Sequence, residues 1–232
     1  MKYMGSKNRI AKHILPIILS ERKNNQWYVE PFVGGGNSID KVSGKRIGGD
    51  SNKYVIQALI SIRDYIDELP KDCSEFTEFD YKNLKKSNYK HKGYAGFVFS
   101  YGGKWMGGWR RDSAGKRDYV KEAYNNALKQ NEKIYGCKFI NCNYYDLDIP
   151  ECSLIYCDPP YLNSTSYGSS KFNHDLFWKW CRYMSKRGND VFISEYNAPS
   201  DFECIFSMEI CSSLTKNTGN KFGNEKLFKY KK

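Results

Sequence analysis

The sequence predicts an α/β fold with a doubly wound, mostly parallel sheet and a small, largely helical insertion. Short apolar strands alternate with amphipathic helices in both halves of the chain, as in a sheet covered by helices on two faces. Two predicted strands end in acids about twenty residues apart, Glu30 and Asp50, a spacing typical of nucleotide-binding sheets. Residues 1–71 and 137–232 together are expected to form the main domain. The basic, aromatic stretch 72–136 is expected to form the insertion.

The composition bounds the possible partners. Lys and Arg number 37 against 26 Asp and Glu, a net charge of +11, which favours a polyanionic partner. The eight cysteines form no C-x-x-C pair and the three histidines are far apart, so we expect no metal site. No export signal or membrane-spanning run is visible, which predicts a protein of the reducing cytoplasm, away from membranes.

The first segment, residues 2–10, should be a loop that enters a helix running to about Leu19, with Pro16 as a kink. Tyr3 and Lys7 flank a Gly-Ser turn, so a bend presents an aromatic ring and a cation together. The simpler alternative is a frayed basic N-terminus.

A glycine loop follows the first strand, which spans about 26–30. Its sequence Glu-Pro-Phe-Val-Gly-Gly-Gly-Asn covers residues 30–37, and glycines let backbone N–H groups approach a ligand closely. We expect a helix from about Ser38, a second strand over 46–50 and an amphipathic helix over about 54–69. These features favour a bound nucleoside-type cofactor, although a plain glycine loop would look similar.

The insertion combines cations with aromatic side chains. Its centre, Tyr101–Arg111, is expected to be a flexible glycine-rich loop, followed by a helix over 116–134. Such a loop can neutralise phosphates and place a side chain into a base stack, whereas lysine runs alone usually form a solvated face. A second basic loop is expected over 212–224. The residues assigned to DNA are Lys104, Trp105, Trp109, Arg110, Arg111, Lys216 and Lys221.

The sheet should resume at 137–143, and Asp146 is placed at a following strand end, where it could accept a hydrogen bond from the adenine amine of the cofactor. An exposed acid in a turn is the equal alternative. Another strand leads into the site described next. A helix over about 172–184 and strands at about 190–196, 203–210 and 226–230 complete the predicted fold.

A rigid turn ends the most apolar strand, Ser153–Cys157, with the sequence Asp158-Pro159-Pro160-Tyr161. The two prolines hold the chain extended. The Asp158 carboxylate and the Pro159 carbonyl can accept hydrogen bonds from an exocyclic amine, and the Tyr161 ring can stack on its ring system. The turn therefore predicts a site for a planar, amine-bearing ring; an acidic turn with a core tyrosine is the alternative.

Six short segments in order resemble the Dam-type DNA adenine N6-methyltransferases, which use S-adenosylmethionine. Residues 2–7 (K-Y-M-G-S-K) resemble their K-W-x-G-x-K box, with Tyr3 in place of Trp. The other five are 30–36 (E-P-F-V-G-G-G), 50–52 (D-S-N), 158–161 (D-P-P-Y), 191–197 (V-F-I-S-E-Y-N) and 225–228 (E-K-L-F). The Trp-Met-Gly-Gly-Trp-Arg-Arg segment matches the family's target-recognition loop only loosely.

The resemblance implies a Rossmann-like methyltransferase sheet, a target-recognition insertion and methyl transfer to N6 of an adenine flipped out of double-stranded DNA. It also implies a restriction-modification setting, and a monomer is expected when no DNA is bound. Asp158, Pro159, Pro160 and Tyr161 are assigned to catalysis. The residues assigned to the cofactor are Tyr3, Lys7, Glu30, Phe32, Gly34, Gly36, Asp50, Asn52, Asp146 and Asp158. For a phage-borne protein, the compartment would be the host cytoplasm.

Two other classes stay open at this point. A related methyltransferase could act on cytosine N4, RNA or a protein glutamine amide, although such enzymes more often carry Ser or Asn in place of Asp158. A basic DNA-binding module without catalysis is the second alternative, and it would show no thermal stabilisation by the cofactor.

Overall fold

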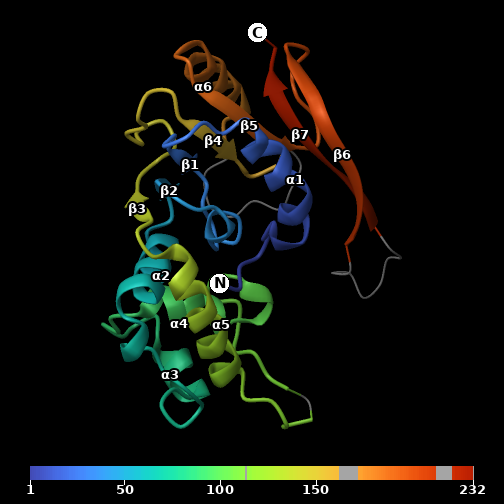
Figure 1. Ribbon diagram of the computed structural model, residues 1–232. Helices are drawn as coiled ribbons and strands as arrows, with labels where there is room; N and C mark the ends of the chain where they lie inside the picture. Colours follow the sequence, from blue (N-terminus) through green and yellow to red (C-terminus); the bar gives the residue numbers. More distant parts are fainter. Residues whose placement is uncertain (113, 162–171, 213–220, 232) are drawn as a thin grey trace.

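The computed structural model describes residues 1–112, 114–161, 172–212 and 221–231. Figure 1 shows a twisted sheet flanked by helices, a helical group beneath one end of it, and a long hairpin along one edge. Among the described residues, no helix is both long and apolar enough to cross a membrane.

The seven described strands form one sheet in the order β3-β2-β1-β4-β5-β7-β6. The parallel strands β3, β2, β1, β4 and β5 lie side by side, and β7 joins β5 antiparallel. Their bounds are β1 Tyr28–Glu30, β2 Arg46–Asp50, β3 Lys138–Asn141, β4 Leu154–Cys157, β5 Asp190–Glu195, β6 Phe202–Ser212 and β7 Lys221–Tyr230. This confirms the doubly wound, mostly parallel sheet.

The order of the strands reverses between β1 and β4, because β2 follows on one side of β1 and β5 on the other side of β4. In open α/β sheets, ligands bind outside the carboxyl ends of the strands at such a switch point. The segments that follow β1, β2 and β4 therefore gather at one edge.

The central strands are buried on both faces, which explains their continuous apolar runs. Along β4, Leu154 and Tyr156 belong to one core cluster, and Ile155 and Cys157 to the other. The helices α1 (Asn8–Ser20) and α2 (Lys53–Asp64) supply the first cluster, and α6 (His174–Lys186) supplies the second.

The helix expected from Ser38 is wrong. Only a single 3-10 turn, η1 (Ile39–Lys41), lies there. Gly36 and Gly44 both have positive φ, +67° and +77°, so the chain turns at each end of a segment too short to support a stable helix.

The strand end expected at Asp146 is also wrong. The third strand stops at Asn141. Asp146 is exposed in a turn, and its N–H donates to the Asn143 carbonyl at 3.0 Å. Tyr144 and Leu147 are buried in the second core cluster, so burial without strand pairing produced the misleading apolar pattern.

The insertion contains α3 (Glu78–Asn83), α4 (Lys92–Val98), η3 (Tyr101–Gly103) and α5 (Tyr119–Ile134), and both α4 and α5 pack on α2. The stretch expected to be a flexible loop is folded back on α4. Met106 N–H donates to the Gly96 carbonyl at 3.0 Å, and Arg110 N–H to the Phe99 carbonyl at 2.9 Å. The segment is therefore a compact turn.

Candidate active site

The Asp158–Tyr161 turn leaves the end of β4 at the switch point. Lys7, which precedes α1, approaches it: its Nζ lies 3.4 Å from Asp158 Oδ1 and 4.1 Å from the centre of the Tyr161 ring. Glu225 of β7 meets both, since Lys7 Nζ lies 3.0 Å from its Oε1 and the Tyr161 hydroxyl donates to its Oε2 at 2.7 Å. Three segments distant in sequence thus form one polar cluster.

Burial sets the electrostatics of this cluster. It raises the pKa of Asp158 to about 6, although Lys7 opposes the rise, and the charge of Glu225 adds to it. Burial alone would lower the pKa of Lys7, but Asp158 and Glu225 together raise it above its ordinary value. At neutral pH the cluster therefore holds an ionised carboxylate next to a protonated amine.

The Tyr161 ring is held by neighbours on more than one side. Besides Lys7, the Tyr196 ring contacts it edge-on, with centroids 4.7 Å apart and planes at 83°. Pro160 and Tyr161 remain partly exposed, and Pro159 is buried. The ring is oriented by its surroundings and is not sunk in the core.

The glycine loop and Asp50 form the second part of the site. Asp50 ends β2, and its carboxylate accepts hydrogen bonds from Gly34 N–H at 3.1 Å and Asn52 N–H at 2.9 Å. Burial raises the pKa of Asp50 to about 6, against the effect of these two hydrogen bonds. Asn52 also caps α2 by accepting from the Tyr54 N–H. The loop and the carboxylate are therefore locked together.

Tyr3 covers the glycine loop. A Cβ on Gly34, whose φ is +48°, would lie 2.9 Å from a Tyr3 ring carbon, so only glycine fits there. On its other side Tyr3 packs against Phe97 of α4, with centroids 5.4 Å apart. The N-terminal segment thus lies between the loop and the insertion.

Glu30 and Phe32 lie deeper than the loop that follows them. Glu30 is 3% exposed, accepts a hydrogen bond from the Tyr28 hydroxyl at 2.8 Å, and burial holds its pKa well above the ordinary value. Phe32 packs against Tyr144 and Phe177 in the second core cluster. Both side chains therefore support the glycine loop from the protein interior.

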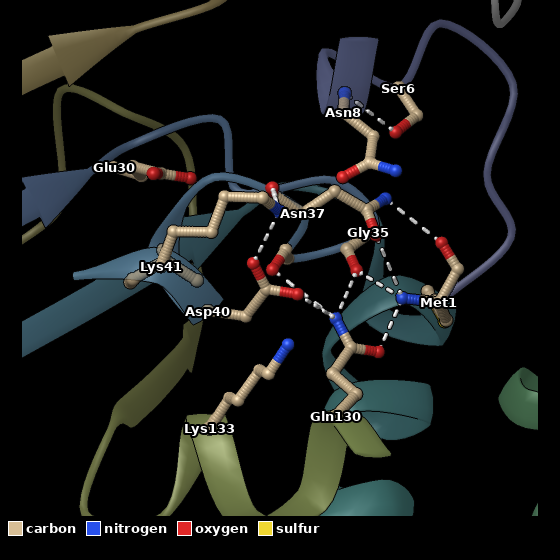
Figure 2. Close-up of polar contacts among 12 residues, drawn as sticks. Met1, Ser6, Asn8, Glu30, Gly35, Asn37, Asp40, Lys41, Gln130 and Lys133 are labelled. Atoms are coloured by element: carbon tan, nitrogen blue, oxygen red, sulfur yellow. Dashed lines mark hydrogen bonds and ion pairs between the residues drawn. The ribbon is translucent and has the colours of Figure 1, made fainter. Parts of the chain in front are cut away.

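Gln130 joins α5 to the glycine loop. Its amide nitrogen donates to the carbonyls of Gly35 at 3.1 Å and Gly36 at 3.2 Å, and lies 3.4 Å from Asp40 Oδ2. Figure 2 shows this amide directed from α5 into the loop, where the Met1 amine also donates to the Gly35 carbonyl. Gln130 is 4% exposed, so the contact is shielded from water.

The two tryptophans expected to contact DNA also pack against other rings of the protein, Trp105 on Tyr54 of α2 and Trp109 on rings within the insertion. The Trp105 ring stacks on Tyr54 with centroids 4.1 Å apart, and Trp109 packs against Tyr81 and Phe99. Both remain partly exposed. Their contact with DNA stays a prediction, beside a packing role that the structure describes.

The predicted DNA-binding cations lie on both sides of the folded turn. Arg110 pairs with Glu122 at 3.0 Å, and Arg111 pairs with Glu78 through two hydrogen bonds; Lys104 is exposed. Of these three cations, Arg111 lines a cavity of about 670 Å³, together with Glu78, Tyr81, Lys82, Lys85, Tyr101, Met106, Gly107, Gly108 and Trp109. Lys216 and the Lys221 side chain lie outside the described parts.

Two residues of the site were missed at the sequence level. Glu225 opens the closing E-K-L-F segment, but strand pairing is needed to bring it to Asp158 and Tyr161. Gln130 lies in a helical pattern with no polar signal to set it apart. Within the described ranges, no group of three or more His, Cys, Asp or Glu side chains could hold a metal ion.

Two sequence comparisons agree with the predicted chemistry, and one solved structure of similar fold is reported with them. The family described as D12 class N6 adenine-specific DNA methyltransferase matches residues 3–97. The Type II methyltransferase M.MjaIII of Methanocaldococcus jannaschii is 27% identical, over 85% of this chain and 84% of its own. The tRNA (m1A58) methyltransferase TrmI of Aquifex aeolicus superposes with a TM-score of 0.45 at 8% identity, over 99% of this chain and 72% of its own.

The family match covers most of the N-terminal segment, the glycine loop, Asp50 and nearly all of α4, and the methyltransferase relative extends across most of the remainder. The resemblance drawn from the six segments is confirmed: residues 3–97 match the D12 class of N6 adenine-specific DNA methyltransferases, a Type II methyltransferase is similar across 85% of the chain, and both findings support methyl transfer to DNA.

Proposed function

We propose that the chain transfers a methyl group from S-adenosylmethionine to N6 of an adenine flipped out of double-stranded DNA. The observation that supports this most is the partly buried Asp158 carboxylate at the switch point, with the Tyr161 ring beside it. An ionised acceptor and a stacking ring are what an exocyclic amine on a purine requires.

The residues around the glycine loop fit the proposed cofactor. The carboxylate at the end of β2, held against the glycine loop by the Gly34 N–H, suits an adenosine whose ribose hydroxyls donate to Asp50. Tyr3, Lys7 and Asn52 would border the same space, and Glu30 and Phe32 would support it from below. Asp146, exposed in its turn, is proposed to reach the adenine amine of the cofactor.

The chemistry asks mainly for alignment. When bound, the cofactor supplies a sulfonium methyl whose S–C bond breaks, leaving its electron pair on sulfur, as the N6 lone pair forms the new N–C bond. Asp158 and the Pro159 carbonyl would accept hydrogen bonds from the amine and favour tetrahedral geometry at nitrogen. Since burial sets the pKa of Asp158 at about 6, its ionised Oδ atoms can also take up the proton that N6 loses.

Double-stranded DNA is proposed to lie across the insertion, residues 72–136, with Lys104, Arg110 and Arg111 on phosphates and Trp105 and Trp109 near the flipped site. Lys216 and Lys221 are proposed to add further contacts to the DNA backbone. Residues 1–71 and 137–232 would then form the catalytic domain. A restriction-modification setting and a monomeric free enzyme complete the proposal.

The test is to incubate the protein with unmethylated duplex DNA and S-adenosylmethionine and to analyse digested nucleosides by mass spectrometry. We expect N6-methyladenine, and a single-turnover rate reduced at least a hundredfold in Asp158→Asn while DNA binding is retained. N4-methylcytosine as the product, or parental rates in the variant, would contradict the proposal.

A further inference from the structure

We propose that Glu225 of β7 is a positioning residue, which holds the Lys7 ammonium and the Tyr161 ring in place around Asp158. This inference rests on the proposed methyl transfer at Asp158 and assigns a role that none of the site residues discussed above fills. Glu225 does not touch the reacting atoms; it acts through two side chains that border them.

The geometry of Glu225 matches that role. Both of its carboxylate oxygens take part: Lys7 Nζ donates to Oε1 at 3.0 Å and to Oε2 at 3.3 Å, and Oε2 also accepts from the Tyr161 hydroxyl at 2.7 Å. The side chains of Lys7 and Glu225 are only 12% and 14% exposed. A pair shielded to this degree is less weakened by water and salt than a surface ion pair.

Both partners need such an anchor. Lysine has a long flexible side chain that a single contact does not fix, and here Asp158 at 3.4 Å and Glu225 at 3.0 Å bracket its ammonium. The Tyr161 ring must present a fixed face to a base. Its hydroxyl tether to Glu225 and its edge contact with Tyr196 set the plane of that ring.

Glu225 also acts on Asp158 electrostatically. Its negative charge raises the pKa of Asp158, in addition to burial and against Lys7. The other ionisable groups that influence or are influenced by Asp158 are Glu30 on β1, Tyr156 on β4, Tyr161 in the same turn, and Tyr196 after β5. Removing the charge of Glu225 should therefore lower the pH at which Asp158 ionises.

The experiment compares Glu225→Gln, Glu225→Ala and Tyr161→Phe with Glu203→Gln as a matched control. Glu203 is an exposed carboxylate on the neighbouring strand β6. We expect single-turnover methylation to fall roughly ten- to a hundredfold in Glu225→Ala, because a loosened site misplaces the reacting groups, and less in Glu225→Gln. The fall should appear in kcat more than in KM for DNA.

Two readouts separate positioning from a structural role. In Glu225→Gln the acid limb of the rate should move to lower pH by roughly half a unit or more, and adding Tyr161→Phe should have a less than additive effect. Lys7 should be acetylated faster in Glu225→Ala than in the parent, by about threefold for each half-unit fall in its pKa, with exposed Lys12 as the internal reference. Folding of each variant is checked by its thermal transition.

An unchanged acid limb, additive effects and parental Lys7 labelling in a folded Glu225→Ala protein would overturn the inference. Glu203→Gln should match the parent in every readout. Failure of the proposed function is distinguishable: a parent protein that methylates no adenine, yet shows faster Lys7 labelling in Glu225→Ala, would contradict the chemistry and leave the contacts of Glu225 intact.

Discussion

At the scale of single residues, two partly buried carboxylates belong to the proposed site. Burial raises the pKa of both Asp50 and Asp158 to about 6, so each is ionised at neutral pH at the expense of folding stability. A group whose folded pKa is raised stabilises the native state most when protonated, at low pH. Function and stability therefore pull in opposite directions at these positions.

The first prediction concerns Asp158 and pH. Its contribution to the free energy of unfolding should be complete below its unfolded pKa and lost as pH rises through about 6. The contribution lost is on the order of 2–3 kcal/mol. This figure is an upper limit, because the ion pairs of the folded protein can rearrange when Asp158 ionises. Denaturant unfolding between pH 4 and 8 should show a flatter pH dependence in Asp158→Asn than in the parent. An equally steep dependence in both would show that Asp158 ionises normally.

Gly34 provides the second prediction. An alanine there must adopt φ +48° and would meet the Tyr3 ring at 2.9 Å, whereas Gly136 has φ +73° with open space around it. Gly136→Ala should lose about 1–2 kcal/mol from the backbone alone, and Gly34→Ala more, because Tyr3 must also move. Calorimetry should show weaker S-adenosylmethionine binding only in Gly34→Ala. Equal effects of both substitutions would show that the contact with Tyr3 does not restrict position 34.

At the scale of elements, the strands could be predicted more fully than the segments between them. Apolar runs and the acids that end them located β1, β2, β4 and β5 to within a few residues, because burial on both faces leaves a continuous signal. The helix predicted after Ser38 and the strand end predicted at Asp146 were wrong. Neither the pair of glycines with positive φ nor the buried turn residues leave a periodic pattern in the sequence.

The candidate site divides in the same way. Asp50, Asp158 and the glycine loop could be predicted because strand ends of a parallel sheet meet at one edge. Glu225 and Gln130 could not, since their roles depend on the antiparallel placement of β7 and on the packing of α5. Long-range contacts of this kind have no local signature.

The third prediction tests the α5 contact. Gln130→Ala removes a buried amide that donates to the Gly35 and Gly36 carbonyls and accepts from the Met1 amine, and the loss of such buried hydrogen bonds should cost about 1–3 kcal/mol. We expect a lower melting temperature and weaker S-adenosylmethionine binding by calorimetry. Asn126→Ala on the exposed face of α5 is the control and should change neither. Parental cofactor affinity in a folded Gln130→Ala protein would mean that the loop holds its shape unaided.

At the scale of the whole molecule, the net charge of +11 favours DNA, but the predicted contacts are not equal. Arg110 and Arg111 already pair with Glu122 and Glu78, and these pairs must open or be shared when phosphate arrives. Lys104 is exposed on the same turn, so it can meet DNA without such an exchange.

The fourth prediction follows from this difference. DNA affinity should fall steeply with salt, and Lys104→Ala should reduce the slope of log affinity against log salt by about one contact. Arg111→Ala should reduce it by less, because part of its charge is already neutralised by Glu78. Lys12→Ala, on the exposed side of α1, is the control. A parental slope in both insertion variants would place the DNA elsewhere on the surface.

The contact between Gln130 and the glycine loop has a consequence for protein engineering. Exchanging the whole stretch 72–136 between related enzymes would introduce a foreign α5. The hydrogen bonds from the Gln130 amide that hold the Gly35 and Gly36 carbonyls would then be lost. Chimeras made to test whether this stretch sets the sequence preference should therefore be joined near Lys116, in the exposed stretch before the α5 cap at Asp118. The recipient then keeps its own contact between Gln130 and the glycine loop, and only the part that contains α3 and α4 is exchanged.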